Sequence, residues 1–525
     1  MDIVLASKRR RFVWSVAAAI TAVAAGDVLF YQRGAYGGQT GFALAALLLL
    51  AIACRPAIWR DRRAWVAAAA AFAFALQMVR DPGPLPWTLY WVAAGMTVLL
   101  PATGTFDDGW RWFQRLLAHA LRSVVAPVLD LVRWRRVRRA RSQWRFNLSD
   151  GLRGVALPII GSGVILLLFV AANPVLAQWV DRLAGPGLWE LDAVRIMIWI
   201  VLLVAAWSLL HPRPIQPIMG TFDGSGELPL PGVTVASVRR SLIAFNLLFA
   251  VQNGLDIAYL SGSVPMPAGI TLADYAHRGA YPLIATALLA ALFVLVTLRP
   301  GSHTAAIPAI RRLVGLWIGQ NLILVASSML RTIDYVEAYS LTGLRLAALA
   351  WMALVGCGLV FILWRLRGGR SASWLINANL AAAGLVVSSF ALTDSAAFVA
   401  SWNARHAADV GGRGAALDLC YLRMLGDSSL PALIELEQRP DIAPALRDRV
   451  RYVRNAVLFT LDRRMHDGGW TWHGERRLAA ARAEFPDLPA RLPMPAGDRM
   501  CDGRLKPPPA PPAPESSPLT VAARP

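Results

Sequence analysis

The chain has 525 residues, of which 56% are hydrophobic and only 16% are charged, whereas ordinary globular domains are about a quarter charged. Its net charge of +20 could indicate a nucleic-acid partner, but the arginines cluster in short segments between apolar runs, as the positive-inside rule describes. The composition excludes an ordinary soluble protein and predicts an all-α fold, a polytopic transmembrane helix bundle.

Long apolar runs recur along the chain, and a run of about 20 apolar residues can cross a bilayer as a helix. Lys8 and three arginines precede the first run, which is too long for a signal-peptide core and is read as the first span. The sequence predicts about eleven spans, at residues 12–30, 41–54, 64–79, 85–100, 154–172, 191–210, 240–260, 279–298, 313–330, 343–366 and 374–399.

Residues 110–131, after the fourth span, have a different pattern. Apolar side chains such as Trp112 and Leu117 recur on one face, and Arg115 and Arg122 lie on the other, which predicts an amphipathic helix in the membrane interface. Six arginines follow: Arg133, Arg135, Arg136, Arg138, Arg139 and Arg141. This cluster is a topogenic cytoplasmic loop in the simplest interpretation. Recognition of anionic lipid headgroups and RNA binding are the alternatives, and we expect the lipid bilayer, not nucleic acid, as the partner.

The distribution of arginine also predicts the orientation. If the N-terminus is cytoplasmic, the basic loops at 55–63, 101–153, 211–240, 299–312 and 365–372 all lie inside, and the outer turns hold few arginines. Eleven spans then place the C-terminus outside.

The predicted organisation has five parts. These are a four-span membrane region (1–109), the amphipathic helix with its basic loop (110–150), a seven-span membrane core (151–400), a soluble helical tail (401–485) and a Pro-rich end expected to be disordered (486–525). Apolar residues at helical spacing predict a tail helix at 445–465, and a second is expected near 475–485.

Polar residues in and beside the later spans form the candidate ligand-binding set, because polar groups inside a membrane need partners. The set comprises Asn246, Gln252, Asn253, Asp256, Tyr259, His277, Arg278, Tyr281, Gln320, Asn321, Asp334, Glu337, Arg345 and Asp394. Asn246, Asn253 and Asp256 share one helix face. Asp256 needs a charged partner, for which Arg278 or Arg345 is expected. A structural cap of ion pairs at the helix ends is the alternative to a ligand site.

Four blocks of residues resemble a known family, at 246–256, 277–282, 317–321 and 335–345. They are similar to the bacterial membrane family called domain of unknown function 4173, with the family numbered 4153 as its nearest alternative, and the resemblance covers about residues 150–440. It implies a bacterial inner-membrane protein with a periplasmic C-terminus on the orientation above, and no established activity, so no catalytic residue is assigned.

Three functions remain open. The first is binding or transport of a small solute, ion or lipid through the outer polar set. The second is a sensor or assembly factor that acts through protein partners. The third is a membrane enzyme on a lipid-linked substrate, with Asp256 or His277 as acid or base. No phosphate-binding, hydrolase or metal motif is present, so we expect no cofactor and no metal.

Four cysteines are present. Cys54 and Cys357 lie in apolar runs, where a lone cysteine is usually a small packed residue. Cys420 and Cys501 lie in the tail. A bridge between them is one interpretation, but Cys501 borders the Pro-rich end, so two free thiols are expected.

Overall fold

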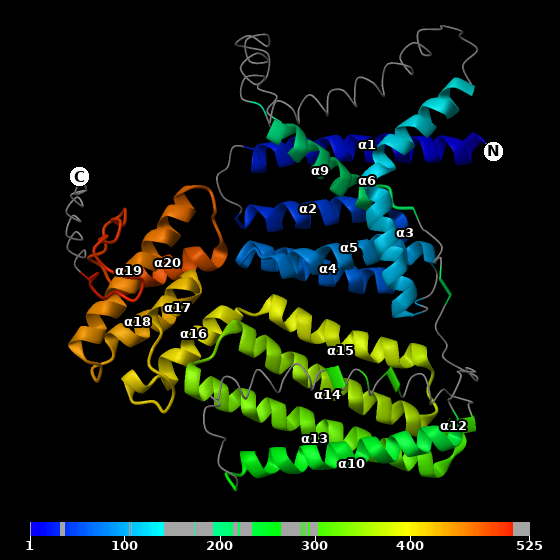
Figure 1. Cartoon of the computed structure of the whole chain (residues 1–525). Helices are drawn as coiled ribbons and strands as arrows, with labels where there is room; N and C mark the ends of the chain where they lie inside the picture. Colours follow the sequence, from blue (N-terminus) through cyan, green and yellow to red (C-terminus); the bar gives the residue numbers. More distant parts are fainter. Residues whose placement is uncertain are drawn as a thin grey trace, which may run out of the picture. The chain divides into compact units, whose positions relative to one another are not determined.

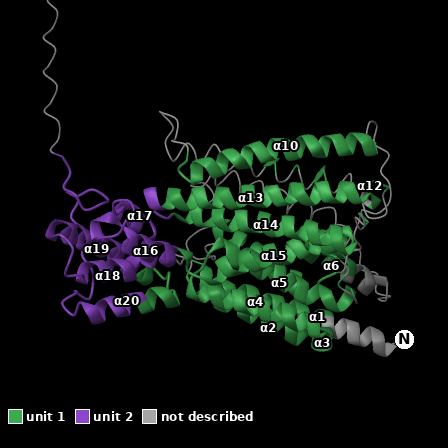
Figure 2. Ribbon diagram, turned by 90° about the horizontal axis from the view of Figure 1, so that it is seen from below, with its two compact units in different colours: residues 1–336, 342–395, 464–476 green, residues 337–341, 396–463, 477–525 purple. Residues whose placement is uncertain are grey.

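The computed structural model describes most of the chain as helices. The described residues are 2–31, 37–103, 106, 108–140, 173, 193–213, 219–220, 234–263, 285–286, 289, 292–293 and 303–507, with the backbone alone for 2–11, 134–140 and 305. Within them the elements are helical apart from one isolated bridge, between Arg499 and Leu505, which confirms the all-α prediction (Figure 1). The chain forms two compact units (Figure 2): unit 1 is 1–336, 342–395 and 464–476, and unit 2 is 337–341, 396–463 and 477–525.

Unit 1 begins with helices α1 (Asp2–Phe30), α2 (Gln39–Cys54), α3 (Pro56–Trp59), α4 (Arg62–Arg80) and α5 (Pro84–Thr103). α4 packs between α2 and α5. It does so through a stripe of small buried residues, Ala64, Ala68, Ala71 and Ala75, which lets helix backbones approach closely in a membrane protein. Asp61 caps this helix, because its side chain accepts a hydrogen bond from the Arg63 amide at 2.9 Å.

The remaining helices of unit 1 are α6 (Gly109–Ala140), α9 (Ala193–Leu210), α10 (Val235–Leu260), α12 (His303–Ala306), α13 (Pro308–Tyr339), α14 (Gly343–Gly368) and α15 (Ala372–Leu392). α9 packs on α1 and α6, and α15 packs on α14 and α5. Trp317 of α13 anchors an apolar core with the rings of Phe245 and Phe249 of α10, at centroid distances of 5.1 and 6.0 Å.

Seven helices in the described part of the chain are long and apolar enough to cross a membrane. Nine of the eleven predicted spans coincide with described helices, while 154–172 and most of 279–298 lie outside the described residues. Two predictions were wrong. The outer turn expected between the ninth and tenth spans, at 331–342, is largely helical, because α13 continues to Tyr339. The last span, expected to reach residue 399, ends at Leu392, where Thr393 adopts an extended backbone.

Unit 2 is a small helical domain. Its elements are η1 (Ala408–Val410), α17 (Leu419–Met424), η2 (Gly426–Ser429), α18 (Leu430–Gln438) and most of α16 (Ser395–His406), α19 (Pro444–His466) and α20 (Trp472–Glu484). The predicted tail helices are confirmed as α19 and α20. The apolar face of α19 is buried as the spacing predicts, at Leu446, Val450, Val453, Val457 and Leu461.

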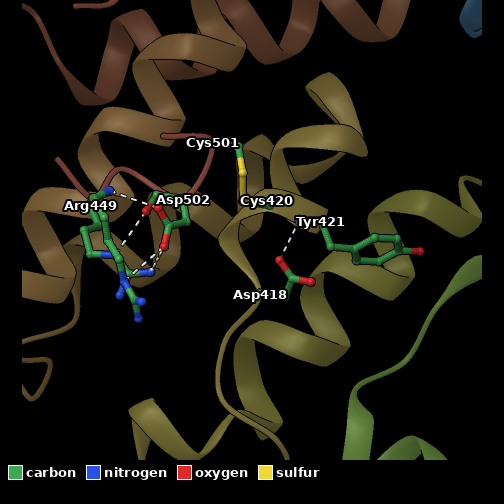
Figure 3. The surroundings of a disulfide bond; sticks show 7 residues. Asp418, Cys420, Tyr421, Arg449, Cys501 and Asp502 are labelled. Atoms are coloured by element: carbon green, nitrogen blue, oxygen red, sulfur yellow. Dashed lines mark hydrogen bonds and ion pairs between the residues drawn. A yellow bond between two sulfur atoms is a disulfide. The ribbon is translucent and has the colours of Figure 1, made fainter. Parts of the chain in front are cut away.

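Cys420 and Cys501 form a disulfide with Cα atoms 5.0 Å apart, so the expectation of two free thiols was wrong (Figure 3). The segment after α20 is fastened to α19. Arg449 binds Asp502 at 3.0 Å, and Arg499 binds Asp448 at 2.6 Å. These charged contacts bring Cys501 to the start of α17, so residues 486–507 belong to unit 2 rather than to a disordered end. Residues 508–525 lie outside the described part.

Candidate functional site

Helices α10 and α13 run parallel and are joined by a ladder of amide hydrogen bonds. Asn246 Nδ2 donates to the Leu313 carbonyl at 3.1 Å, and Asn253 Nδ2 donates to the Gln320 carbonyl at 3.0 Å. Donor and acceptor both advance by seven residues, the repeat of two parallel helices packed along a common seam. The predicted polar face of α10 therefore faces α13.

The ladder ends in a buried ion pair between Asp256 and Arg331, whose side chains are 4% and 6% exposed. Asp256 also accepts hydrogen bonds from Ser327 Oγ at 3.0 Å and Gln252 Nε2 at 2.9 Å. Several donors of this kind are needed because an unpaired carboxylate inside a membrane is costly. The Asp256 carboxylate is therefore fully engaged, which disfavours a role as a catalytic acid or base.

The predicted pairing of Asp256 with Arg345 was wrong. The other predicted partner, Arg278, lies outside the described residues. The Arg345 guanidinium lies instead over the Tyr335 ring, 4.1 Å from its centroid. Sequence reasoning missed Arg331 because it placed the end of the span at residue 330. The sequence carried no signal for this pairing, because the register of α13 beside α10 is marked by the backbone carbonyls of Leu313 and Gln320, which only the structure shows.

Three amide side chains lie at one level of the pair: Asn253, Gln320 and Asn321. We call them the amide cluster. Asn253 and Asn321 are buried, with 6% and 1% exposure. The side-chain oxygens of all three are shielded from solvent and accept no hydrogen bond from the described residues, and the same holds for Asn246 one rung below. A buried acceptor without a donor costs about 1 to 3 kcal/mol.

The other predicted residues do not join this site in the described structure. Asp334 and Glu337 are exposed, and Tyr259 and Asp394 are partly buried. Glu337 belongs to unit 2, whereas Asp334, Arg345 and Asp394 belong to unit 1. His277 and Tyr281 lie outside the described residues. Among the residues described, no group of three or more His, Cys, Asp or Glu side chains is placed to hold a metal ion.

The predicted interfacial helix, α6, is fastened to unit 1 by a second buried carboxylate. Asp130 accepts a hydrogen bond from Trp207 Nε1 at 3.2 Å and pairs with Arg213, and His211 Nδ1 lies 3.1 Å away. At the other end of α6, the Gly109 amide donates to Asn377 Oδ1 at 2.7 Å.

The structure describes only part of the predicted lipid-headgroup set. Arg133 is 53% exposed. Arg135, Arg136, Arg138 and Arg139 lie on the helical backbone of α6 without described side chains, and Arg141 lies outside the described residues.

Comparisons with known proteins identify the family but no activity. No curated protein and no solved structure matches the chain. The family model described as domain of unknown function DUF4153 matches residues 15–436, from α1 into α18. The resemblance to family 4173 is not confirmed, and the match includes the N-terminal helices that the resemblance did not cover. The chain is a multi-pass membrane protein that belongs to the DUF4153 family.

Proposed function

We propose that the α10–α13 pair binds a small cation at the amide cluster. The supporting observation is the set of buried side-chain oxygens on Asn253, Gln320 and Asn321 that no described donor satisfies. Carbonyl oxygens are the groups that replace the hydration shell of a small cation inside a membrane protein. Binding of an ion would therefore remove the cost of leaving these acceptors unpaired.

The ion pair above the cluster is compatible with such a site. Asp256 neutralises Arg331, so the pair adds no net charge that would repel a cation. Ten residues separate Asn321 from Arg331 along α13, which is about 15 Å of helix. The Asn253 amide donor is already used to hold the two helices together, and the Asn321 donor binds the Trp317 carbonyl within α13, which leaves the oxygens of these side chains to accept from a ligand.

Thermal unfolding of the purified full chain in detergent tests the proposal, with sodium, potassium, ammonium or choline chloride at constant ionic strength. A ligand that binds only the folded state stabilises it by about 2.7 kcal/mol at one hundred times its Kd. We expect one of the small cations to raise Tm relative to choline. Equal Tm values in all four salts would contradict the proposal.

A matched pair of variants locates the effect. Asn321 donates to the carbonyl four residues earlier at 2.8 Å, and Asn379 of α15 makes the same contact at 2.9 Å. Asn321→Leu removes an oxygen of the amide cluster and should abolish the salt-specific shift in Tm. Asn379→Leu removes a comparable amide elsewhere and should retain that shift.

For localisation, we propose the bacterial inner membrane, with the N-terminus inside and the tail outside. The basic loops support this orientation. So does the disulfide Cys420–Cys501, because such bonds persist in oxidising compartments. Residues 464–476, which belong to unit 1, pack at the start of α2, the end of that helix opposite the basic loop at 55–63, where the Gly38 amide donates to the Trp470 carbonyl at 2.5 Å. A reporter fused after Arg405 should be active only if it functions in the periplasm, and cytoplasmic activity would contradict the proposal.

A further inference from the structure

Helix α6 has two unlike faces. The buried face carries polar and aromatic side chains, namely Trp112, His119, Ser123 and Asp130, together with Ala126. The opposite face is an exposed apolar stripe: Phe113, Leu117, Leu121, Val124 and Val128, with exposed fractions of 56%, 49%, 67%, 62% and 63%. The helix is thus polar towards the protein and apolar away from it, the reverse of a surface helix in water.

The buried face is fixed by specific contacts, so the direction of the apolar stripe is fixed as well. Asn377 accepts a hydrogen bond from the first residue of α6, and Asp130 is held by Trp207 and Arg213 near the far end. Between them, Trp112 belongs to the apolar core that α2, α4 and α5 form. Turning α6 to cover the stripe would break all of these contacts.

The same contacts place α6 across one end of the helix bundle. Asn377 lies near the start of α15, and Arg213 follows the end of α9. Figure 1 shows α6 running across one end of α2, α4 and α5 rather than alongside them. Arg213 and, just before α15, Arg370 lie at this end.

We propose that the apolar stripe of α6 is embedded in one membrane leaflet and that the arginines at its end bind acidic lipid headgroups. Amphipathic helices with an apolar face and basic flanks lie in this way at the interface. Arg115 lies over the Trp112 ring, 5.3 Å from its centroid, on the side away from the stripe, and five arginines follow within α6 from Arg133 to Arg139. A second copy of this chain is a poorer occupant of the surface, because it would bring an identical basic cluster against the first.

Spin-label accessibility in liposomes identifies what covers the stripe. Leu121→Cys and, as a control, Arg60→Cys in an exposed loop are labelled in full-length protein carrying Cys54→Ala and Cys357→Ala, with the tail disulfide left intact. At Leu121 we expect frequent collisions with oxygen, which dissolves in lipid, and few with a water-soluble nickel complex. The oxygen-to-nickel ratio should be several-fold higher than at Arg60. Frequent nickel collisions would place the stripe in water, and few collisions with either reagent would place it against protein. Both results would overturn the proposal.

A charge-matched comparison tests the lipid preference. The full chain is extracted from bilayers that contain both phosphatidylglycerol and phosphatidylcholine. Native mass spectrometry then measures the enrichment of the acidic lipid, which is the ratio of bound phosphatidylglycerol to bound phosphatidylcholine. Replacing Arg135, Arg136 and Arg138 by glutamine should lower the enrichment of the acidic lipid about tenfold. Replacing Arg60, Arg62 and Arg63, which carry the same charge, should leave the enrichment near the parent value. Equal losses in the two variants, or no enrichment in the parent protein, would overturn the proposal.

Discussion

Each of the two units contains a buried ion pair between an acidic residue and an arginine. The two pairs differ in whether the acidic residue has a second charged partner. In unit 1, Asp256 and Arg331 are 4% and 6% exposed, and the other donors to Asp256 are neutral side chains. In unit 2, Glu437 and Arg454 are 6% and 5% exposed and lie 3.2 Å apart. There a second arginine, Arg451, also binds Glu437, at 2.9 Å.

The comparison shows that equal burial does not mean equal dependence on one partner. Glu437 retains Arg451 if Arg454 is lost, and Arg454 is additionally covered by the Phe485 ring at 3.8 Å. Asp256 retains only Ser327 and Gln252 among the partners described above if Arg331 is lost. The membrane pair should therefore respond more strongly to removal of its arginine.

The largest expected effect is that of Arg331→Gln. It leaves the Asp256 carboxylate buried without its counter-charge, which costs about 3 to 5 kcal/mol. Adding Asp256→Asn should restore part of the loss, and the matched change Arg454→Gln should cost less, about 1 to 3 kcal/mol. Unfolding in detergent mixtures measures these losses, with Arg345→Gln as the control. Additive losses in the double variant would contradict the Asp256–Arg331 pairing.

Removal of the disulfide should come next. Cys420 and Cys501 are 81 residues apart, and loss of a cross-link typically costs about 2 to 4 kcal/mol. Cys420→Ser should lower the stability of unit 2 under non-reducing conditions. Alkylation before and after reduction gives the direct check: in the parent protein the two tail thiols should react only after reduction. Equal labelling in both samples would mean that no bridge forms.

A smaller effect is expected from pH at α6. Burial, and secondarily the charge of Arg55, lowers the pKa of His119 to about 4, below the ordinary value of about 6.5. The unfolded chain therefore binds a proton below about pH 6.5 that the folded protein does not bind until about pH 4, so stability is lost as pH falls through this range. The loss should be about 2 kcal/mol between pH 7 and pH 5. His119→Gln should remove this component from the pH dependence of unfolding, and an unchanged pH profile in that variant would contradict it.

The smallest expected effect is that of Asn246→Leu in the amide ladder. A hydrogen bond between membrane helices contributes about 0.6 kcal/mol on average and rarely more than about 1.7 kcal/mol. The variant should thus remain folded and lose much less stability than Arg331→Gln in the same unfolding assay. A loss as large as that of the ion pair would mean that the ladder, rather than the pair, fixes the two helices.

Local pattern predicted several features of the site. The seven-residue spacing of Asn246 and Asn253 placed them on one helix face, and that face contacts α13. The need of Asp256 for a cationic partner was also foreseen. The identity of that partner could not be predicted from the sequence, because it depends on which turn of α13 lies beside Asp256 and on the continuation of α13 to Tyr339. Hydropathy marks where a helix enters lipid, but it does not mark where the helix ends.

The sequence by itself determined the fold class, the order of the helices and the buried face of α19, because these follow from apolar periodicity along a single segment. Only the tertiary structure decided the pairs that join distant segments. Cys501 meets Cys420 because Arg449 and Asp448 of α19 bind Asp502 and Arg499 on either side of it. Composition made the end of the chain look disordered because its prolines exclude helix. Composition could not predict the charged contacts with α19, because they form only once that helix has folded.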